Sequence, residues 1–273
     1  MTKARRQMQE DISLIDLVIE LVDARAPLSS RNPDIDELGK NKARLILLNK
    51  ADLADPEKNA AWAAYFRAQG FFTAETDSRR SGDMKAVNAV IREASAEKRE
   101  RDRKRGIKNR PVRAMVAGIP NVGKSTFINS FAGRSCAKTG NKPGVTKGKQ
   151  WIRLNKEVEL LDTPGILWPK FDDQEAAMRL AFTGAIKDEI LNTEELALRL
   201  IDVLRKDYPG ALSRRYGTEE NGTAAELLER IALCRGCVKR GEEQDYERAA
   251  NLLLDDFRAG RLGRITLESP DKI

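Results

Sequence analysis

The sequence contains no histidine and only three cysteines, Cys136, Cys234 and Cys237. An odd number of cysteines in a chain of this length is not a disulfide framework. Cys234 and Cys237 form a C-x-x-C pair, but a structural zinc site would need two more ligands, and only Cys136 is left over. We therefore interpret the C-x-x-C pair as free thiols on a helix.

The sequence also lacks any apolar run long enough to span a bilayer. Lys3, Arg5 and Arg6 make its start basic, but no apolar signal-peptide core follows them. Glu10 and Asp11 come next, and such early acidic residues argue against a transit peptide. We expect a cytoplasmic protein without a membrane partner, and nothing in the sequence demands more than a monomer.

Basic residues are in excess, with 49 Lys and Arg against 42 Asp and Glu, while aromatic residues make up only 5%. This balance suggests a polyanion partner, most simply RNA or DNA, although a charged soluble surface would explain it equally well. The basic residues are densest from about 98 to 113, where Gly106 and Pro111 interrupt helical spacing. We predict a helix end and a basic linker there.

Short apolar runs alternate with helical patterns over the first part of the chain. Strands are predicted at 17–22, 44–48, 71–73, 112–117 and 157–161, and helices at 56–69, from 83 onward and at 124–131. This alternation predicts an α/β fold with a mainly parallel sheet and helices on both faces. After about residue 171 only helical spacing continues, with a capping box at 223–226. We expect two domains, residues 1–171 and a small all-helical domain at 172–273.

A glycine-rich segment at 118–125 matches G-x-x-x-x-G-K-S between a predicted strand and a predicted helix. Its glycines allow backbone N–H groups to close around phosphate oxygens at a helix N-terminus. Lys124 is expected to reach the β- and γ-phosphates, and Ser125 to ligate Mg²⁺. The residues expected to contact phosphate are Asn121, Val122, Gly123, Lys124, Ser125 and Thr126.

Two further segments are candidates for the γ-phosphate side of this site. Asp162, which follows an apolar strand, is expected to hold Mg²⁺, and Gly165 to offer its backbone N–H to the γ-phosphate. Thr146 is expected to be the switch threonine that closes on Mg²⁺ and the γ-phosphate. A plain Asp-Pro-Gly turn and an ordinary loop threonine are the alternatives. Lys124, Thr146 and Gly165 are thus our candidate catalytic residues.

The segment Asn49, Lys50, Ala51 and Asp52 is expected to select the base. The Asp52 carboxylate can accept hydrogen bonds from N1–H and the 2-amino group of guanine, a donor pair that adenine lacks. Asn49 would steady the loop, and the Lys50 stem would lie along the ring. Asp77 and Ser78 follow the next predicted strand, where a backbone contact to the guanine oxygen is expected.

In ordinary GTPases the phosphate segment precedes the base-selecting segment, whereas here 49–52 comes before 118–125. The full order is base segment, its supporting loop at 77–78, phosphate loop, switch threonine and the segment at 162–165 (G4-G5-G1-G2-G3). These residues in this order resemble the circularly permuted GTPases, and in particular the YlqF/RbgA ribosome biogenesis family. The segments carrying the resemblance are 23–25, 49–52, 118–126, 162–170 and 183–188.

The resemblance covers nearly the whole chain and implies GTP hydrolysis coupled to maturation of the large (50S) ribosomal subunit. It implies the subunit precursor and its rRNA as partners, no DNA, and GTP-controlled association with the pre-ribosome. It also suggests that Asn121 helps to bind K⁺; the alternative is that Asn121 only shapes the loop. A GTPase in another RNA-maturation process and a nucleotide-gated RNA-binding scaffold with negligible turnover remain open.

The usual water-orienting groups are missing from the sequence. The glutamine that follows the switch glycine in small signalling GTPases is replaced by Ile166, whose aliphatic side chain cannot align a water. Family members usually carry a histidine in an early Phe-Pro-Gly-His-Met stretch, which has no counterpart here. We therefore expect slow intrinsic turnover, stimulated by ribosomal particles and K⁺.

Overall fold

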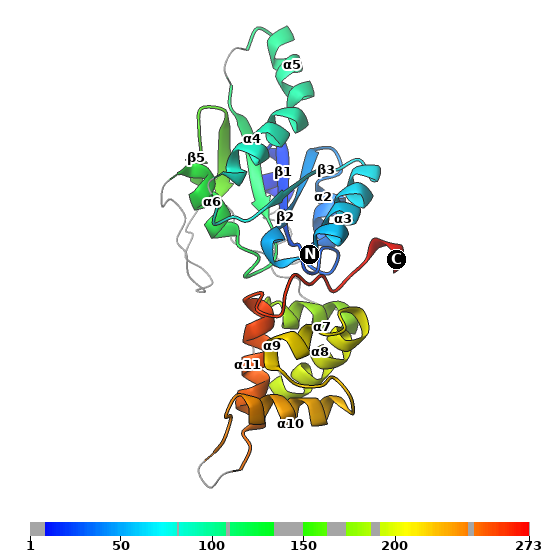
Figure 1. The fold of residues 1–273 in the computed structure, drawn as a ribbon. Helices are drawn as coiled ribbons and strands as arrows, with labels where there is room; N and C mark the ends of the chain where they lie inside the picture. The colour runs from blue at the N-terminus through cyan, green and yellow to red at the C-terminus, as the bar shows by residue number, and fades with distance from the viewer. Residues whose placement is uncertain are drawn as a thin grey trace.

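A computed structural model describes residues 9–80, 82–107, 110–133, 150–162, 173–186, 192–239 and 243–272. A six-stranded sheet covered by helices forms one part, and a bundle of helices forms the other (Figure 1). The prediction of an α/β fold with a mainly parallel sheet is confirmed. Among the described residues, no helix has the length and apolar character needed to cross a membrane.

The sheet has the strand order β3-β2-β1-β4-β6-β5. Its strands are β1 (Leu17–Asp23), β2 (Ala43–Asn49), β3 (Phe72–Thr76), β4 (Val112–Ala117), β5 (Gln150–Arg153) and β6 (Val158–Asp162). All pair in parallel except β5, which runs antiparallel to β6 at the edge. The sequence did not predict β5, because its four residues contain no apolar run. Asp23 is paired with Asn49, and Asn49 with Thr76, so these strand ends meet at one edge.

Helices cover both faces of the sheet, as predicted. Their bounds are α2 (Pro33–Leu38), α3 (Pro56–Ala68), α4 (Asp83–Ala94), α5 (Ala96–Lys104) and α6 (Lys124–Ala132). Helices α4 and α6 pack on the β1 face that carries Leu17, Ile19 and Leu21, and α3 packs on the opposite face against Val22. This arrangement buries every residue of β1.

One helix was not predicted and one helical prediction needs correction. The short helix α2 begins because Asn32 caps it and Pro33 suits its first turn. The long helix expected from Asp83 is divided between α4 and α5 at Ser95. The Ser95 hydroxyl donates to the carbonyl of Ile91, four residues earlier. Such back-bonding competes with regular helix geometry.

The helical region consists of α7 (Gln174–Phe182), α8 (Thr193–Asp207), α9 (Ala211–Tyr216), α10 (Ala224–Cys234) and α11 (Tyr246–Arg258) around its own apolar core. The predicted capping box between Thr223 and Glu226 is present at the start of α10. Both described cysteines of the C-x-x-C pair are free. Only Cys234 is helical, however; Cys237 lies beyond α10 and is buried in the core of the helical region.

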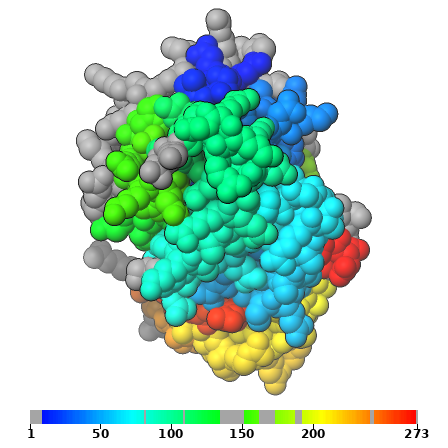
Figure 2. Space-filling model, turned by 90° about the horizontal axis from the view of Figure 1, so that it is seen from above, coloured from blue at the N-terminus to red at the C-terminus, as the bar shows by residue number. Residues whose placement is uncertain are grey.

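The C-terminal segment returns from the helical region to the sheet. The backbone N–H groups of Ile265 and Leu267 donate to the carbonyls of Leu53 (3.0 Å) and Arg25 (2.7 Å). In Figure 2 this red segment lies between the cyan helices of the sheet part and the yellow helical region. Residues that follow β1 and β2 are therefore joined to the end of the chain.

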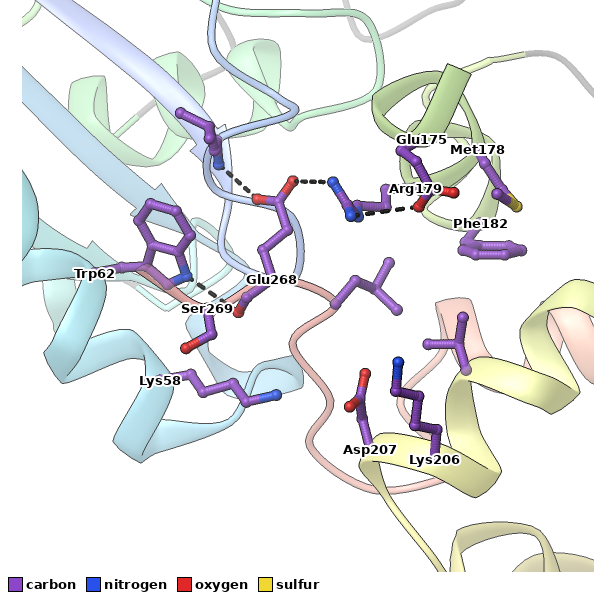
Figure 3. Close-up of a pocket in the computed structure, with 13 residues that line it drawn as sticks. Lys58, Trp62, Glu175, Met178, Arg179, Phe182, Lys206, Asp207, Glu268 and Ser269 are labelled. Carbon is purple, nitrogen blue, oxygen red and sulfur yellow. Dashed lines mark hydrogen bonds and ion pairs between the residues drawn. The ribbon is translucent and has the colours of Figure 1, made fainter. Parts of the chain in front are cut away.

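A cavity of about 360 Å³ lies in the same seam, between α3, α7 and α8 (Figure 3). The Glu268 carboxylate accepts hydrogen bonds from the backbone N–H groups of Leu28 (2.7 Å) and Ser29 (3.0 Å), and the Trp62 indole donates to the Glu268 carbonyl (3.3 Å). Burial raises the pKa of the Glu268 carboxyl despite these donors. These contacts hold the C-terminal segment against the sheet part, and Arg179 of α7 lies 3.6 Å from the Glu268 carboxylate, which links the helical region to the same point.

Candidate nucleotide site

A second cavity, of about 420 Å³, lies at the edge of the sheet where β1, β2 and β3 end. The end of β2 and the loops after β2 and β3 contribute Asn49, Lys50, Asp77 and Ser78 to its lining. The loop before α6 and the first turn of α6 contribute Asn121, Gly123 and Thr126. Seven residues predicted for base and phosphate contact therefore line one space. The chain order is reconciled by topology, because β2 and β4 both pair with β1.

The buried side chain of Asn49 joins three loops. Its amide nitrogen donates to the Val122 carbonyl (2.6 Å), and its amide oxygen accepts from the backbone N–H (3.1 Å) and hydroxyl (2.7 Å) of Ser78. A Cβ on Gly123 would lie 2.5 Å from this amide nitrogen, and Gly123 has a φ of 101°. Only glycine fits that position without strain, so the phosphate loop and the base loop are matched in shape.

The phosphate loop (residues 118–125) ends at the first turn of α6. The Lys124 ammonium donates to the carbonyls of Gly118 (2.6 Å) and Ile119 (2.7 Å) and has no ion-pair partner among the described residues. Burial lowers the pKa of Lys124 to about 8. A half-buried ammonium beside a helix N-terminus, without a carboxylate to balance it, fits a bound polyphosphate.

The predicted Mg²⁺ ligands share one edge of the sheet as far as they are described. Ser125 lies in the first turn of α6, after β4, and Asp162 ends β6, the neighbour of β4. Hydroxyl and carboxylate oxygens are the ligand types that Mg²⁺ prefers, so this pair of residues fits the ion. Thr146 and Gly165 lie outside the described residues.

Asp52 lies in the short 3-10 helix η1 (Ala51–Leu53) that follows Lys50. Its Oδ2 accepts from the Arg79 guanidinium at 2.6 Å, while its Oδ1 is buried and has no hydrogen-bond partner among the described residues. Asp52 does not itself line the cavity, whereas Arg79 does. Ala51 contributes its carbonyl to Asn59 (3.4 Å), a contact that steadies the loop rather than the cavity wall.

Asp23 and Arg25, which the sequence analysis did not assign to the site, form a buried ion pair there, and Arg25 also lines the cavity. Asp23 accepts from the Lys50 ammonium (2.9 Å) and from the Arg25 guanidinium through both oxygens (2.8 and 2.9 Å). Burial alone would raise the pKa of Asp23, but the two cations outweigh it and hold that pKa well below its ordinary value. A buried acid at a strand end, two residues before an arginine, was the available signal.

The helical region forms part of the cavity wall through Thr183, Gly184 and Arg258. Arg25 donates to the carbonyls of Arg258 (3.3 Å) and Thr183 (3.4 Å), and its guanidinium lies 5.4 Å from the centre of the Phe257 ring. The Asn121 amide nitrogen donates to the Gly184 carbonyl (2.9 Å). The cavity is therefore bounded by both parts of the molecule, which sequence spacing alone could not reveal.

The chain is similar to known proteins over its whole length. The family model described as 50S ribosome-binding GTPase matches residues 113–230. Ribosome biogenesis GTPase A of Bacillus cereus is 48% identical over 273 residues, covering 100% of this chain and 92% of that protein. The protein of the same name from Priestia megaterium is 47% identical over 274 residues, covering 100% of this chain and 95% of that protein.

Solved structures show the same fold in a relative. The crystal structure of GNP-bound YlqF from T. maritima matches this structure with a TM-score of 0.73 and a sequence identity of 29%. The match covers 100% of this chain and 100% of that chain. Identity over the full length, the matching GTPase model and the shared fold lead to one assignment. The chain belongs to the ribosome biogenesis GTPase A (YlqF/RbgA) family and is a GTPase that hydrolyses GTP.

Proposed function

We propose that this GTPase is an assembly factor for the large (50S) ribosomal subunit in the cytoplasm, and that its nucleotide state controls its association with the pre-ribosome. One observation carries the proposal: the cavity lined by the predicted nucleotide residues is also lined by Thr183, Gly184 and Arg258 of the helical region. A nucleotide in this cavity would touch both parts, so its hydrolysis could change how they sit together.

In this proposal, guanine lies between the loops at 49–52 and 77–79, and the phosphates lie over residues 121–126. Lys124 neutralises the β- and γ-phosphates, and Ser125, Thr146 and Asp162 hold Mg²⁺, which would polarise the γ-phosphate. The backbone N–H of Gly165 contacts the γ-phosphate. The Lys50 stem is positioned because Asp23 binds its ammonium at 2.9 Å.

Asn121 is proposed as a ligand of K⁺. Its amide nitrogen already donates to Gly184 at 2.9 Å, so the amide oxygen is the atom that a cation would bind. A cation at this position would stabilise charge on the phosphates as an arginine finger does. Turnover in K⁺ should exceed turnover in Na⁺, and Asn121→Ala should remove that difference. Equal rates in the two salts would contradict this assignment.

We propose that a basic surface of the protein binds rRNA. Exposed basic side chains lie in the last turns of α5 and directly after it, including Arg101, Arg103, Lys104 and Arg105. Residues 172–273 form the proposed ribosome-binding domain. The names of the relatives and the description of the family model support a ribosomal partner. Contacts to phosphates would weaken as salt rises.

Co-sedimentation with large-subunit precursors tests the proposal. Binding should be tight with a non-hydrolysable GTP analogue and weaker with GDP, and GTP turnover should rise when the particles are added. Equal binding in both nucleotide states would contradict nucleotide control, and binding only to small subunits would place the protein in another RNA-maturation process.

A nucleotide-gated RNA-binding scaffold with negligible intrinsic turnover is the alternative, favoured by Ile166 at the position after Gly165. Turnover that stays negligible with every ribosomal particle and in K⁺ would support this alternative over the leading proposal.

A further inference from the structure

Arg79 holds the carboxylate that the proposed function assigns to guanine. Its Nη2 donates to Asp52 Oδ2 at 2.6 Å, and Arg79 lines the cavity while Asp52 does not. We propose that Arg79 is a specificity-determining residue that competes with the base for Asp52, so that a nucleotide must displace Arg79 in order to bind. This inference rests on the proposed role of Asp52 as the base-selecting residue.

The loop that carries Arg79 is held in place independently of Asp52. The Asp77 carboxylate accepts from Arg79 Nε (2.9 Å) and Nη2 (3.1 Å), and the Asp77 backbone N–H donates to Asp83 (2.9 Å). The carbonyl of the next residue, Ser78, accepts from the Ser130 hydroxyl of α6 (2.5 Å). Arg79 can therefore release Asp52 while its contact with Asp77 keeps it beside the cavity.

The exposure of the pair shows which contact is easily exchanged. The Arg79 side chain is 66% exposed and that of Asp52 is 24% exposed, against 11% for Asp77. Exposed ion pairs are weak because water and salt screen them. Asp52 Oδ1, in contrast, is buried and has no hydrogen-bond partner among the described residues, so a ligand that donates to both oxygens satisfies more than Arg79 does.

Guanine supplies that pair of donors through N1–H and its 2-amino group, and adenine does not. An adenine nucleotide lacks these two donors and cannot replace the hydrogen bond from Arg79. Arg79 therefore stays bound to Asp52 and occupies the position that the edge of the base would take. Arg79 therefore excludes the wrong base, and it lowers the affinity and association rate of the correct one.

The test compares Arg79→Ala with Arg80→Ala, using fluorescently labelled GDP and stopped-flow mixing. Arg80 is the exposed neighbour with the same charge, and it does not line the cavity. Arg79→Ala should bind GDP about two- to fivefold more tightly, mainly through faster association, because one exposed ion pair no longer competes. Arg80→Ala should bind GDP no more tightly than the wild type. Tighter binding by both variants, or unchanged or weaker binding by Arg79→Ala, would overturn the proposal.

A second variant separates this inference from the proposed function. Asp52→Asn should weaken GDP binding more than tenfold, and adding Arg79→Ala to it should then change little, because the ion pair with Arg79 is already absent. If Asp52→Asn binds GDP normally, the assignment of Asp52 is wrong. If Asp52→Asn behaves as expected but Arg79→Ala still alters GDP binding in its presence, Arg79 acts by another route and the competition model is wrong.

Discussion

Replacing Arg25 with glutamine should weaken the connection between the nucleotide cavity and the helical region. The Arg25 guanidinium pairs with Asp23 and donates to the carbonyls of Thr183 and Arg258. Asp23 in turn binds Lys50, next to the proposed base position. Arg25→Gln removes the middle of this series of contacts while leaving the cavity wall otherwise intact.

The cost follows from burial. The side chains of Arg25 and Asp23 are only 2% and 3% exposed, and removing one partner of a buried pair typically costs 3–5 kcal/mol. Asp23 keeps Lys50 as a partner, so we expect about 3 kcal/mol, the lower end of that range. Denaturant unfolding of the nucleotide-free protein measures this value.

Arg31→Gln is the matched control. Arg31 is another buried arginine, and it pairs with Glu20, which keeps Arg44 as a second partner. Its other described contacts, with Asp36 and the rings of Phe66 and Phe71, lie within the sheet part. It should therefore lose a similar stability, about 3 kcal/mol by the same reasoning, without affecting the helical region.

Hydrogen exchange with and without GDP distinguishes the two variants. In the wild type and in Arg31→Gln, GDP should slow exchange at Thr183, Gly184 and the end of α11. In Arg25→Gln that protection should weaken at Thr183 and at the end of α11, which carry the carbonyls that Arg25 contacts. Protection of the phosphate loop and of Gly184, which Asn121 contacts, should persist. GDP-dependent protection of α11 that is undiminished in Arg25→Gln would refute the reasoning, whatever the stability loss.

Three further predictions follow from the site. Burial lowers the pKa of Lys124 to about 8, and bound phosphate favours its charged form. GDP binding at pH 8 without metal should therefore take up about half a proton. Calorimetry in buffers of different ionisation enthalpy measures this uptake, and the control Lys124→Arg, which does not titrate, should take up almost none. Gly123→Ala places a Cβ 2.5 Å from the Asn49 amide at a φ of 101°, so it should cost about 1–3 kcal/mol and abolish GDP binding; wild-type affinity would show that the loops are not matched as described. The pKa of Asp23 is depressed in the folded state, so the Asp23 carboxylate stabilises the fold above the ordinary pKa of 3.8, and this stabilisation is lost as pH falls towards the folded pKa. The stability advantage of the wild type over Asp23→Asn should shrink by about 1.4 kcal/mol per pH unit below 3.8. A difference in stability that stays constant over this range would contradict the assignment.

Some elements of the fold were predictable because local pattern decides them. The apolar runs of β1, β2 and β4 must be buried on both faces, and a parallel sheet between helices is the arrangement that achieves this. The glycine-rich segment at 118–125 allows the positive φ angles that Gly118 and Gly123 adopt in the phosphate loop. The edge strand β5 and the helix α2 carry weaker patterns, and their placement depends on neighbours that are distant in sequence.

The candidate site divides in the same way. Asn49, Asp52 and Lys124 could be proposed from motif spacing, and their roles in binding nucleotide stay predictions. Arg79 could not be found this way, because an arginine in a loop has no local pattern that reveals its partner. Arg25 follows the acid at the end of β1 by two residues, but its contacts with Thr183 and Arg258 had no local signal.

The sequence by itself determined the chemistry of this protein: residue types and their spacing specify groups that suit guanine and phosphate, and their order specifies a permuted chain. Only the tertiary structure decided which groups meet. Parallel pairing of β2 and β4 with β1 brings residues 49 and 122 into contact, and the returning C-terminal segment sets the helical region against the same cavity. The physical reason is that an ion pair or hydrogen bond depends on distance in space, and separations of 158 or 233 residues along the chain leave no trace in local pattern.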